Sequence, residues 1–503
     1  MSTKDKPKSV KDMAPNPEAI ELAEQGIDAD EFPNLVINKQ ITRSNIANCF
    51  FDNSLGGYWD ADDNGDYRKH GLDAFKRRLK IKGFQDVRPP AAAGEEEADR
   101  AKPIDYALTY IEDQQSVAKA CPLAGYRKGI QTIGGQTGNA KKFLITEEAN
   151  LIEPHQGDGS IIENFFAQLF YTDEQLNYFK AWLKISVNQL HEGIIASAPV
   201  VCLCSKRGYG KSAFLSLISL IFGGRNADAK ESLLNGGKFN DDLSGAETWF
   251  LDDVVSPDNH QQRERLASLI KRVAATPYES IEAKNKGRFT APVWRRLLIC
   301  TNDGMKDVAV LPPSGDESRK DKLMIFKAHK ADATPLKPDS LKNKSDAVMD
   351  YQKVIPAIAA FLWDLNKWEI PKEIIPPPHS NRWGFKTYEN PEIVEMLSED
   401  QPDTHLHNLI QSIMDPQNKN IGDIEGPSTE FFKSLDDYDS RGVNELKLTA
   451  RSLAKHFEKL KERFPHIYQI KVTTWRGKKG MKVLHAKNEA WENSYFEDVK
   501  EDA

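Results

Sequence analysis

Residues 199–221 combine an apolar run, a short loop of small residues and a second apolar run, and the loop carries residue types that bind phosphate. Pro199-Val-Val-Cys-Leu-Cys204 predicts a buried strand, and Ala213-Phe-Leu-Ser-Leu-Ile-Ser-Leu-Ile221 predicts a helix. Between them lies Ser205-Lys-Arg-Gly-Tyr-Gly-Lys-Ser212. A strand, a small-residue loop, Lys-Ser and a helix in this order are typical of a phosphate-binding loop, or P-loop.

Each residue type in this loop has a chemical reason. Gly208 and Gly210 let backbone N–H groups approach phosphates without a clashing Cβ. Lys211 supplies positive charge to the β- and γ-phosphates, Ser212 can ligate Mg²⁺, and the helix N-terminus adds its dipole. Ser205 stands where the motif usually has its first Gly, and a small residue suffices at that turn. The predicted ligands are ATP and Mg²⁺, bound by Ser205, Gly208, Tyr209, Gly210, Lys211, Ser212 and Ala213.

Two further apolar runs end in polar residues that suit hydrolysis. Thr248-Trp-Phe-Leu-Asp-Asp-Val-Val255 ends in Asp252, which would hold the Mg²⁺ shell through water, and Asp253, which would orient or deprotonate the attacking water. Trp294-Arg-Arg-Leu-Leu-Ile-Cys-Thr-Asn302 ends in Asn302, which could contact both the γ-phosphate and that water. An Asn capping a turn is the alternative, and the order of the three strands favours the catalytic interpretation.

The elements that must position these residues fall into five zones. The pattern from 196 to 330 alternates apolar strands with helices, which predicts an α/β domain. The fold class is therefore multidomain α/β. The zones are a disordered lead (1–35), an accessory domain with a Tyr58–Tyr67 hairpin and a basic helix (36–100), a mainly helical region (101–192), the P-loop domain with a lid helix kinked or restarted at Pro356 (193–370), and a basic C-terminal region with an acidic tail (380–503).

With three such strands in this order, the chain resembles superfamily-3 helicases of the phage and plasmid primase-helicase group, over roughly residues 120–330. Pro122-Leu-Ala-Gly125 and Trp182-Leu-Lys184 resemble the helical collar that precedes the ATPase in this group. Gly223-Gly-Arg225 followed by Lys238-Phe-Asn240 is similar to the stretch between its first two motifs. The resemblance implies an AAA+-like core and a ring, a homohexamer, that uses ATP and Mg²⁺ to translocate on DNA.

The resemblance also implies two roles outside the P-loop. Such helicases place a basic β-hairpin in the ring channel, and the segment 278–290 assigns this role to Lys284, Lys286 and Arg288; a solvated basic turn is the alternative. Hexameric ATPases complete each site with a cation from the neighbouring subunit. Arg319 fits this pattern, and Lys320, Lys322 and Arg272 stay open as alternatives.

The net charge of −7 hides a basic C-terminal segment. From Arg441 to Lys487 there are thirteen Lys and Arg against three Asp and Glu, an excess of +10. A helix, a strand, a basic turn and a strand in this segment suggest a winged-helix-like domain, although a basic helix is often only a solvated face. The predicted phosphate contacts are Lys447, Arg451, Lys455, Arg476, Lys478 and Lys479.

Composition excludes several other classes. No run approaches eighteen apolar residues, so no membrane span is expected. The five cysteines have no disulfide or metal spacing, which suits a reducing cytoplasm. The resemblance to phage and plasmid helicases implies that this is the cytoplasm of a bacterial host. The stretch Asp60-Ala-Asp62-Asp-Asn64-Gly65 resembles the start of a calcium loop, but Gly71 stands where a Glu belongs, so a hairpin turn is favoured.

The sequence therefore predicts an ATP-dependent DNA helicase in the replication of a phage or mobile element. Its partners would be single-stranded or forked DNA, further copies of itself, and a separate primase or polymerase. Two alternatives remain. One is a P-loop ATPase that loads or remodels proteins or serves in host defence, and the other is a DNA-binding initiator that uses ATP only to assemble.

Overall fold

The computed structural model of the 503-residue chain describes most of its first 400 residues and short pieces beyond them. The described ranges are 43–87, 102–134, 140–233, 241–252, 260–282, 289–312, 319–341, 348–378 and 382–399, then the strands 425–427, 473–475 and 478–482 and scattered residues between 406 and 460. The chain divides into two compact units. The first comprises Met1–Ala149, Phe239–Ala246 and Tyr278–Trp294, and the second Asn150–Lys238, Glu247–Pro277 and Arg295–Ala503.

The first unit contains two small sheets, a hairpin and two longer helices. Its elements are β1 (Cys49–Asp52), β2 (Gly57–Ala61), β3 (Tyr67–His70), α2 (Leu72–Ile81), α3 (Pro103–Gln114), β4 (Ser116–Val117), β5 (Lys119–Cys121), β6 (Gly129–Gly134), β7 (Ala140–Ile145), α8 (Asp241–Ser244), β11 (Tyr278–Ile281) and β12 (Phe289–Pro292). One sheet has the order β3-β2-β1-β4 and the other β5-β7-β6, while β11 and β12 pair with each other.

The hairpin and basic helix expected near the N-terminus are confirmed. Strands β2 and β3 are antiparallel, and α2 buries Phe75 and Leu79 in a core where the ring of Tyr58 stacks on Phe75 at 4.6 Å. In the acidic turn, one oxygen of Asp62 accepts the backbone N–H groups of Asn64 and Asp66. These hydrogen bonds are those of a tight turn, as the hairpin interpretation requires.

The expectation of a mainly helical region over 101–192 is wrong for its middle part. Between α3 and the next helix the chain forms the four short strands β4 to β7. Their faces are apolar enough to build a core of their own: Phe143 and Ile145 on β7 pack with Ile281 and Ala291 of the β11–β12 hairpin. Of the region 101–192, only residues 150–192 belong to the second unit.

The second unit contains a parallel sheet covered by helices. Its elements are α4 (Ser160–Phe170), α5 (Asp173–His191), β8 (Val200–Cys204), α6 (Lys211–Ile221), β9 (Asn226–Asp228), α7 (Lys230–Leu233), β10 (Thr248–Asp252), α9 (His260–Ala275), β13 (Arg296–Thr301), α10 (Met305–Val308), β14 (Leu323–Lys327), α11 (Tyr351–Lys367) and α12 (Pro391–Glu399). The lid helix predicted to be kinked or restarted at Pro356 does not restart there, because α11 is one helix that contains this proline.

The five strands of this sheet run in the order β14-β8-β13-β10-β9, and all neighbouring pairs are parallel. Strand β8 lies inside the sheet, between β14 and β13, and is buried at all five positions, as its Val, Cys and Leu residues require. The chain continues from β8 to the edge strand β9 on one side of the sheet, and from β13 to the edge strand β14 on the other side. The direction of these connections therefore reverses between the neighbouring strands β8 and β13. Ligands of open α/β sheets bind at such a place, beyond the carboxyl ends of the strands.

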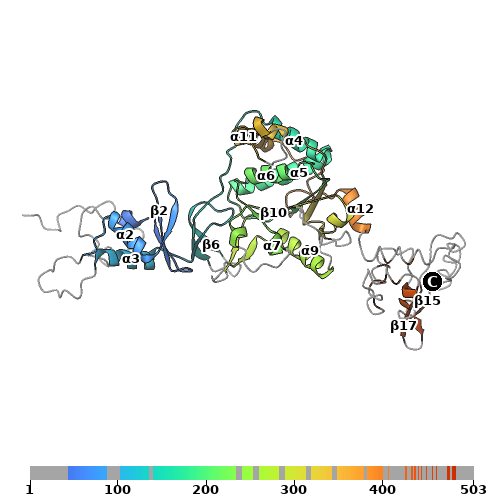
Figure 1. Ribbon diagram of the computed structural model, residues 1–503, viewed down its shortest axis with the longest axis horizontal. Coiled ribbons are helices and arrows are strands. Elements are labelled where there is room, and N and C mark those ends of the chain that lie inside the picture. The colour runs from blue at the N-terminus through green and yellow to red at the C-terminus, as the bar shows by residue number, and fades with distance from the viewer. Residues whose placement is uncertain are drawn as a thin grey trace, which may run out of the picture. The chain divides into compact units, whose positions relative to one another are not determined.

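Helices lie on both sides of this sheet: α4, α5, α6 and α11 on one side and α7 and α9 on the other (Figure 1). Aromatic side chains join the first layer to the sheet. The ring of Phe166 on α4 lies within 6.5 Å of the rings of Phe179 on α5, Phe214 on α6 and Phe361 on α11, and Phe326 of β14 packs against Phe170. Truncating a buried Phe of this kind typically costs ~3–5 kcal/mol.

In the C-terminal part, β15 (Glu425–Pro427), β16 (Thr473–Trp475) and β17 (Lys478–Lys482) form an antiparallel sheet in the order β15-β17-β16. The basic turn predicted at 476–480 is therefore shorter, because Lys478, Lys479 and Gly480 belong to β17. The winged-helix assignment stays a prediction. Among the described helices, none is both long and apolar enough to cross a membrane.

Candidate nucleotide-binding site

The predicted P-loop lies between β8 and α6, and its two glycines adopt conformations that other residues disfavour. Gly208 has φ of 80° and Gly210 has φ of 102°. A Cβ on Gly210 would also meet the ring of Phe165 at 3.4 Å. Gly210 caps α6, so the left-handed turn directs the chain into a helix whose first residue is Lys211.

Ser205 occupies the turn position at which the motif usually has glycine. Its side chain is fully buried, and its N–H donates to the carbonyl of Thr301 on β13 at 3.1 Å. Tyr171 is the single non-glycine residue with positive φ in the described part of the chain, so Ser205 needs no glycine-like backbone. The physical requirement at this turn is small size, and serine meets it.

Lys211 and Asn302 lie together, although the chain separates them widely. The Lys211 ammonium donates to the carbonyl oxygen of Ser205 at 3.1 Å and to Oδ1 of Asn302 at 2.9 Å. The parallel pairing explains the contact, because Cys204 of β8 is in register with Thr301 of β13, and Asn302 follows directly. Lys211 is only 8% exposed, so these neutral oxygens solvate a nearly buried cation.

Asp252 ends β10 at the same edge of the sheet, in register with Cys300 of β13. Ser212 is exposed in the first turn of α6. A hydroxyl and a carboxylate are hard oxygen ligands of the kind that Mg²⁺ takes in addition to phosphate oxygens and water. Among the described residues, no group of three His, Cys, Asp or Glu side chains could hold a metal without such help. Asp253 lies outside the described residues.

The thiol at the end of β8 does not contribute a nucleophile. Burial raises the pKa of Cys204 to about 12, and the nearby carboxylate of Asp303 acts in the same direction, while Lys211 opposes it. Burial likewise raises the pKa of Cys202. Both side chains therefore remain neutral thiols that pack in the sheet.

Arg319, the predicted contact to a neighbouring subunit, is enclosed in its own chain. It is 1% exposed, donates to the carbonyl of Pro312 at 2.9 Å and forms an ion pair with Glu389 at 3.1 Å. Glu389 in turn forms a β-bridge to Ile325 of β14. These surroundings give Arg319 a stabilising role within the chain and lend no support to a role between subunits. Lys320 and Arg272 are exposed.

The predicted DNA-binding hairpin has an ordered stem. Strands β11 and β12 are antiparallel, with Ile281 opposite Phe289. Ile281, Ala291 and Val293 are buried in the first unit, and Phe289 packs at 5.6 Å from Phe143. The tip residues Lys284, Lys286 and Arg288 lie outside the described residues, as do Lys447, Arg451, Lys455 and Arg476 and the side chains of Lys478 and Lys479.

A segment absent from the sequence motifs also borders the P-loop. After β14, the N–H of Ala328 donates to the carbonyl of Cys204 at 2.8 Å, and the N–H of Ala331 donates to the carbonyl of Tyr209 at 3.3 Å. Residues 328–331 therefore run alongside the loop. No local sequence signal marks them, because backbone hydrogen bonds between distant segments leave no residue-type pattern.

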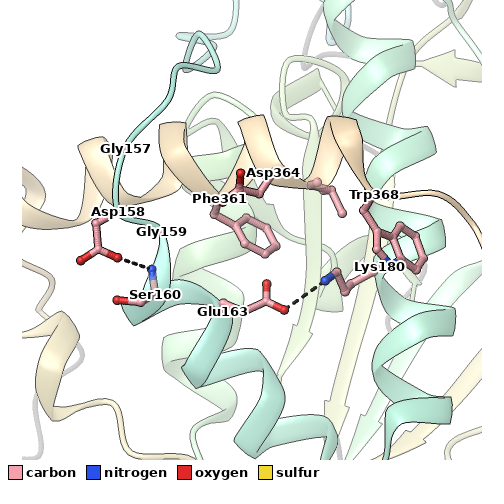
Figure 2. Close-up of a pocket in the computed structure, with 10 residues that line it drawn as sticks. Gly157, Asp158, Gly159, Ser160, Glu163, Lys180, Phe361, Asp364 and Trp368 are labelled. Atoms are coloured by element: carbon pink, nitrogen blue, oxygen red, sulfur yellow. Dashed lines mark hydrogen bonds and ion pairs between the residues drawn. The ribbon is translucent and has the colours of Figure 1, made fainter.

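A separate cavity of about 420 Å³ lies between the start of α4, α5 and the end of α11 (Figure 2). Glu163 and Lys180 form an ion pair at 3.0 Å there, and Phe361 and Trp368 supply aromatic surface. No residue of the P-loop lines this cavity. The predicted nucleotide-binding residues described above lie instead at the carboxyl ends of the strands.

Comparison with known proteins gives a family match and distant structural likenesses. Residues 203–319 match a family of unknown function, DUF5906. No curated protein matches the chain. Among solved structures, the apo NrS-1 C-terminal region is 13% identical, with 87% of this chain and 96% of that chain covered and a TM-score of 0.49. SCCmec type IV Cch, an active helicase, is 12% identical, with 82% and 74% covered and a TM-score of 0.30.

Proposed function

We propose that this protein is an ATP-driven DNA helicase of the superfamily-3 type that acts in the replication of a phage or mobile element, in the cytoplasm of a bacterial host. The observation that carries the ATPase part is the hydrogen bond between Lys211 and Asn302. It joins the start of α6 to the end of a neighbouring strand, behind a left-handed glycine turn. The helicase part is supported by the order of the P-loop, Asp252 and Asn302 along the chain, which is AAA+-like, and by the basic hairpin.

The residues of the loop divide the binding of ATP between them. Backbone N–H groups from Gly208 to Ala213 surround the phosphates, and Lys211 neutralises the β- and γ-phosphates. Ser212 and Asp252 hold Mg²⁺, directly or through water. The bound ion neutralises charge on the phosphate oxygens. Because Lys211 is nearly buried among neutral oxygens, an anionic phosphate improves its solvation.

Hydrolysis then depends on the residues at the strand ends. Asp253 orients or deprotonates the attacking water. Asn302 binds the γ-phosphate and this water once Lys211 has exchanged the Asn302 oxygen for a phosphate oxygen. Lys211 and Asn302 therefore change partners when ATP enters, which links occupation of the site to the end of β13.

Coupling to DNA is assigned to basic residues outside the loop. Lys284, Lys286 and Arg288 contact the DNA backbone in the channel of a homohexamer, and Lys447, Arg451, Lys455, Arg476, Lys478 and Lys479 contact it from a winged-helix-like domain. A cation from the neighbouring subunit completes each ATP site. Lys320 and Arg272 are exposed, which favours either of them over the buried Arg319 for this role. A separate primase or polymerase would complete the replication machinery.

The test is ATP turnover with and without single-stranded DNA, combined with unwinding of a forked duplex. Strong stimulation by DNA together with unwinding is the expected result. Turnover without stimulation would instead indicate an ATPase that remodels or loads proteins. ATP binding without turnover would indicate an initiator that uses ATP for assembly. Either of these results would overturn the helicase proposal.

A further inference from the structure

Tyr171 is held in a backbone conformation that disfavours any residue with a side chain. It follows α4 with φ of 53° and ψ of −44°, and the carbonyl of Phe170 accepts the N–H of Thr172 at 2.6 Å. These values describe a γ-turn of the rare, strained form, centred on a bulky residue. Glycine would adopt the turn with less strain. Strain of this kind concentrates at functional sites.

The strained turn presents an aromatic ring at the surface. Tyr171 is 70% exposed, and its ring stacks on the imidazole of His329 with centroids 4.3 Å apart and planes 19° apart. Burial of apolar surface therefore does not explain the tyrosine. A stacked pair with this exposure offers a flat surface on which a further planar group can stack.

Backbone contacts place this pair beside the P-loop. The N–H of His329 donates to the carbonyl of Leu169 at 2.8 Å, which ties His329 to the end of α4. His329 lies in the segment 328–331, whose two ends bond to Cys204 and to Tyr209 of the loop. The ring of Phe165 on α4 also lies against Gly210. Both elements that carry the aromatic pair thus border the loop.

We propose that Tyr171 and His329 form the stacking platform for the base of the nucleotide whose phosphates bind to the P-loop. The proposal rests on the proposed nucleotide-binding function and adds the residues that bind the other end of the same ligand. Stacking needs only a π-face, and purines have a larger face than pyrimidines. The platform therefore favours a purine nucleoside triphosphate without reading its hydrogen-bonding edge.

Comparing a ligand with a base to one without a base tests the platform. Binding of Mg·ATP and of Mg·tripolyphosphate is measured for the full chain by calorimetry. Tyr171→Ala and His329→Ala should each raise the Kd of ATP about tenfold, the loss expected for one base–aromatic stack. The Kd of tripolyphosphate should not change. Tyr171→Phe, which keeps the ring, should bind ATP like the wild type, as should the control Tyr351→Ala, which removes another exposed tyrosine.

Tyr171→Gly separates binding from folding. It relieves the strained turn and removes the ring, so its Tm should rise while its ATP affinity falls. If Tyr171 had only a structural role, Tyr171→Gly would change the Tm and the ATP affinity in the same direction. Equal loss of ATP and tripolyphosphate binding, unchanged ATP binding, or loss of single-stranded DNA binding alone would overturn the proposal. A wild type that binds no ATP, or binds it equally well after Lys211→Ala, would instead overturn the proposed function.

Discussion

The chemistry of the candidate site depends on one cation, Lys211, that is 8% exposed and hydrogen-bonded to neutral oxygens. A desolvated ammonium of this kind is stabilised by any anion that replaces those oxygens. At the residue scale, Asn302 solvates Lys211, and in the function proposed above it would be released to face the γ-phosphate when ATP binds. Substitutions at position 302 can separate these functions.

We expect Asn302→Ala to bind Mg·ATP within about threefold of the wild type and to hydrolyse it about 100-fold more slowly, the usual cost of losing one transition-state hydrogen bond. Asn302→Asp should bind ATP more weakly than Asn302→Ala, because a carboxylate would hold Lys211 in an ion pair and repel phosphate. Lys211→Ala should lose turnover by orders of magnitude. ATP binding by Asn302→Asp that equals that of Asn302→Ala would contradict the proposed exchange of partners.

Arg319 gives a second prediction at this scale, and it concerns stability. Removing one partner of a buried ion pair typically costs ~3–5 kcal/mol, because the remaining charge is left in a poorly solvated place. Arg319→Ala should therefore lower the free energy of unfolding by an amount of this order, and Arg319→Ala/Glu389→Ala by less than the sum of the two single changes. Lys320→Ala, a nearby exposed control, should not change stability in a urea titration.

A mixing experiment separates this role from one between subunits. If Arg319 completes a neighbour's site, Arg319→Ala and Asp253→Asn chains that are each inactive should regain turnover when mixed rings form. We expect no such rescue for Arg319, because its guanidinium is enclosed by Pro312 and Glu389. Rescue with a well-folded Arg319→Ala chain would show that the arginine leaves these partners in the ring.

The sequence predicted the strand, the loop and the helix of the candidate site better than the contacts around them. Glycine spacing, Lys-Ser and the apolar flanks are local patterns, and they indicated the strand, the loop and the helix. The burial of Arg319 was not predictable, because a charged residue before a strand usually lies at the surface. Tyr171 and His329 were missed because they lie far apart in the chain and only their three-dimensional contact gives them a role.

At the scale of elements, the stem and the tip of the β11–β12 hairpin have different predicted roles: the stem stabilises the first unit, and the tip couples ATP hydrolysis to DNA. Its stem is buried with Phe143 in the first unit, whereas its tip carries the predicted DNA contacts. Lys284→Ala/Lys286→Ala should keep basal ATP turnover and stability but lose unwinding of a forked duplex. Lys141→Ala/Lys142→Ala, two exposed lysines at the start of β7, remove the same charge and should unwind normally. Equal loss of unwinding in both double variants would show that the loss follows from the change in net charge and not from the position of the lysines on the hairpin.

Elements with a long apolar pattern were predicted correctly from the sequence, and several elements with a short pattern were not. The five buried residues of β8 and the long helices α5 and α11 were predictable because each has an extended period or run. The strands β4 to β7 were not, because they have two to six residues and their burial depends on the pairing of β4 with β1 and of β7 with β5 and β6. Such pairing leaves little trace in a short segment, so 101–192 was predicted to be mainly helical.

At the scale of the whole molecule, the chain passes between the two units several times, since the first includes 239–246 and 278–294. The proposed ATP site lies entirely in the second unit, and the stem of the hairpin lies in the first. A ligand that binds only one unit stabilises that unit, by about 2.7 kcal/mol at a concentration 100 times its Kd. The cysteines report on each unit separately.

Thiol labelling should therefore show which unit ATP stabilises. Burial raises the pKa of Cys49 in the first unit and of Cys204 in the second to about 12, so both stay neutral and unreactive at pH 8 until their unit opens. In moderate urea, a saturating non-hydrolysable ATP analogue with Mg²⁺ should slow alkylation of Cys204 about 100-fold and leave Cys49 unchanged, as measured by mass spectrometry. Cys121, which is partly exposed, serves as the reference for reagent activity. The analogue should protect neither cysteine in Lys211→Ala. Equal protection of Cys49 and Cys204 in the wild type would show instead that the two units unfold as one.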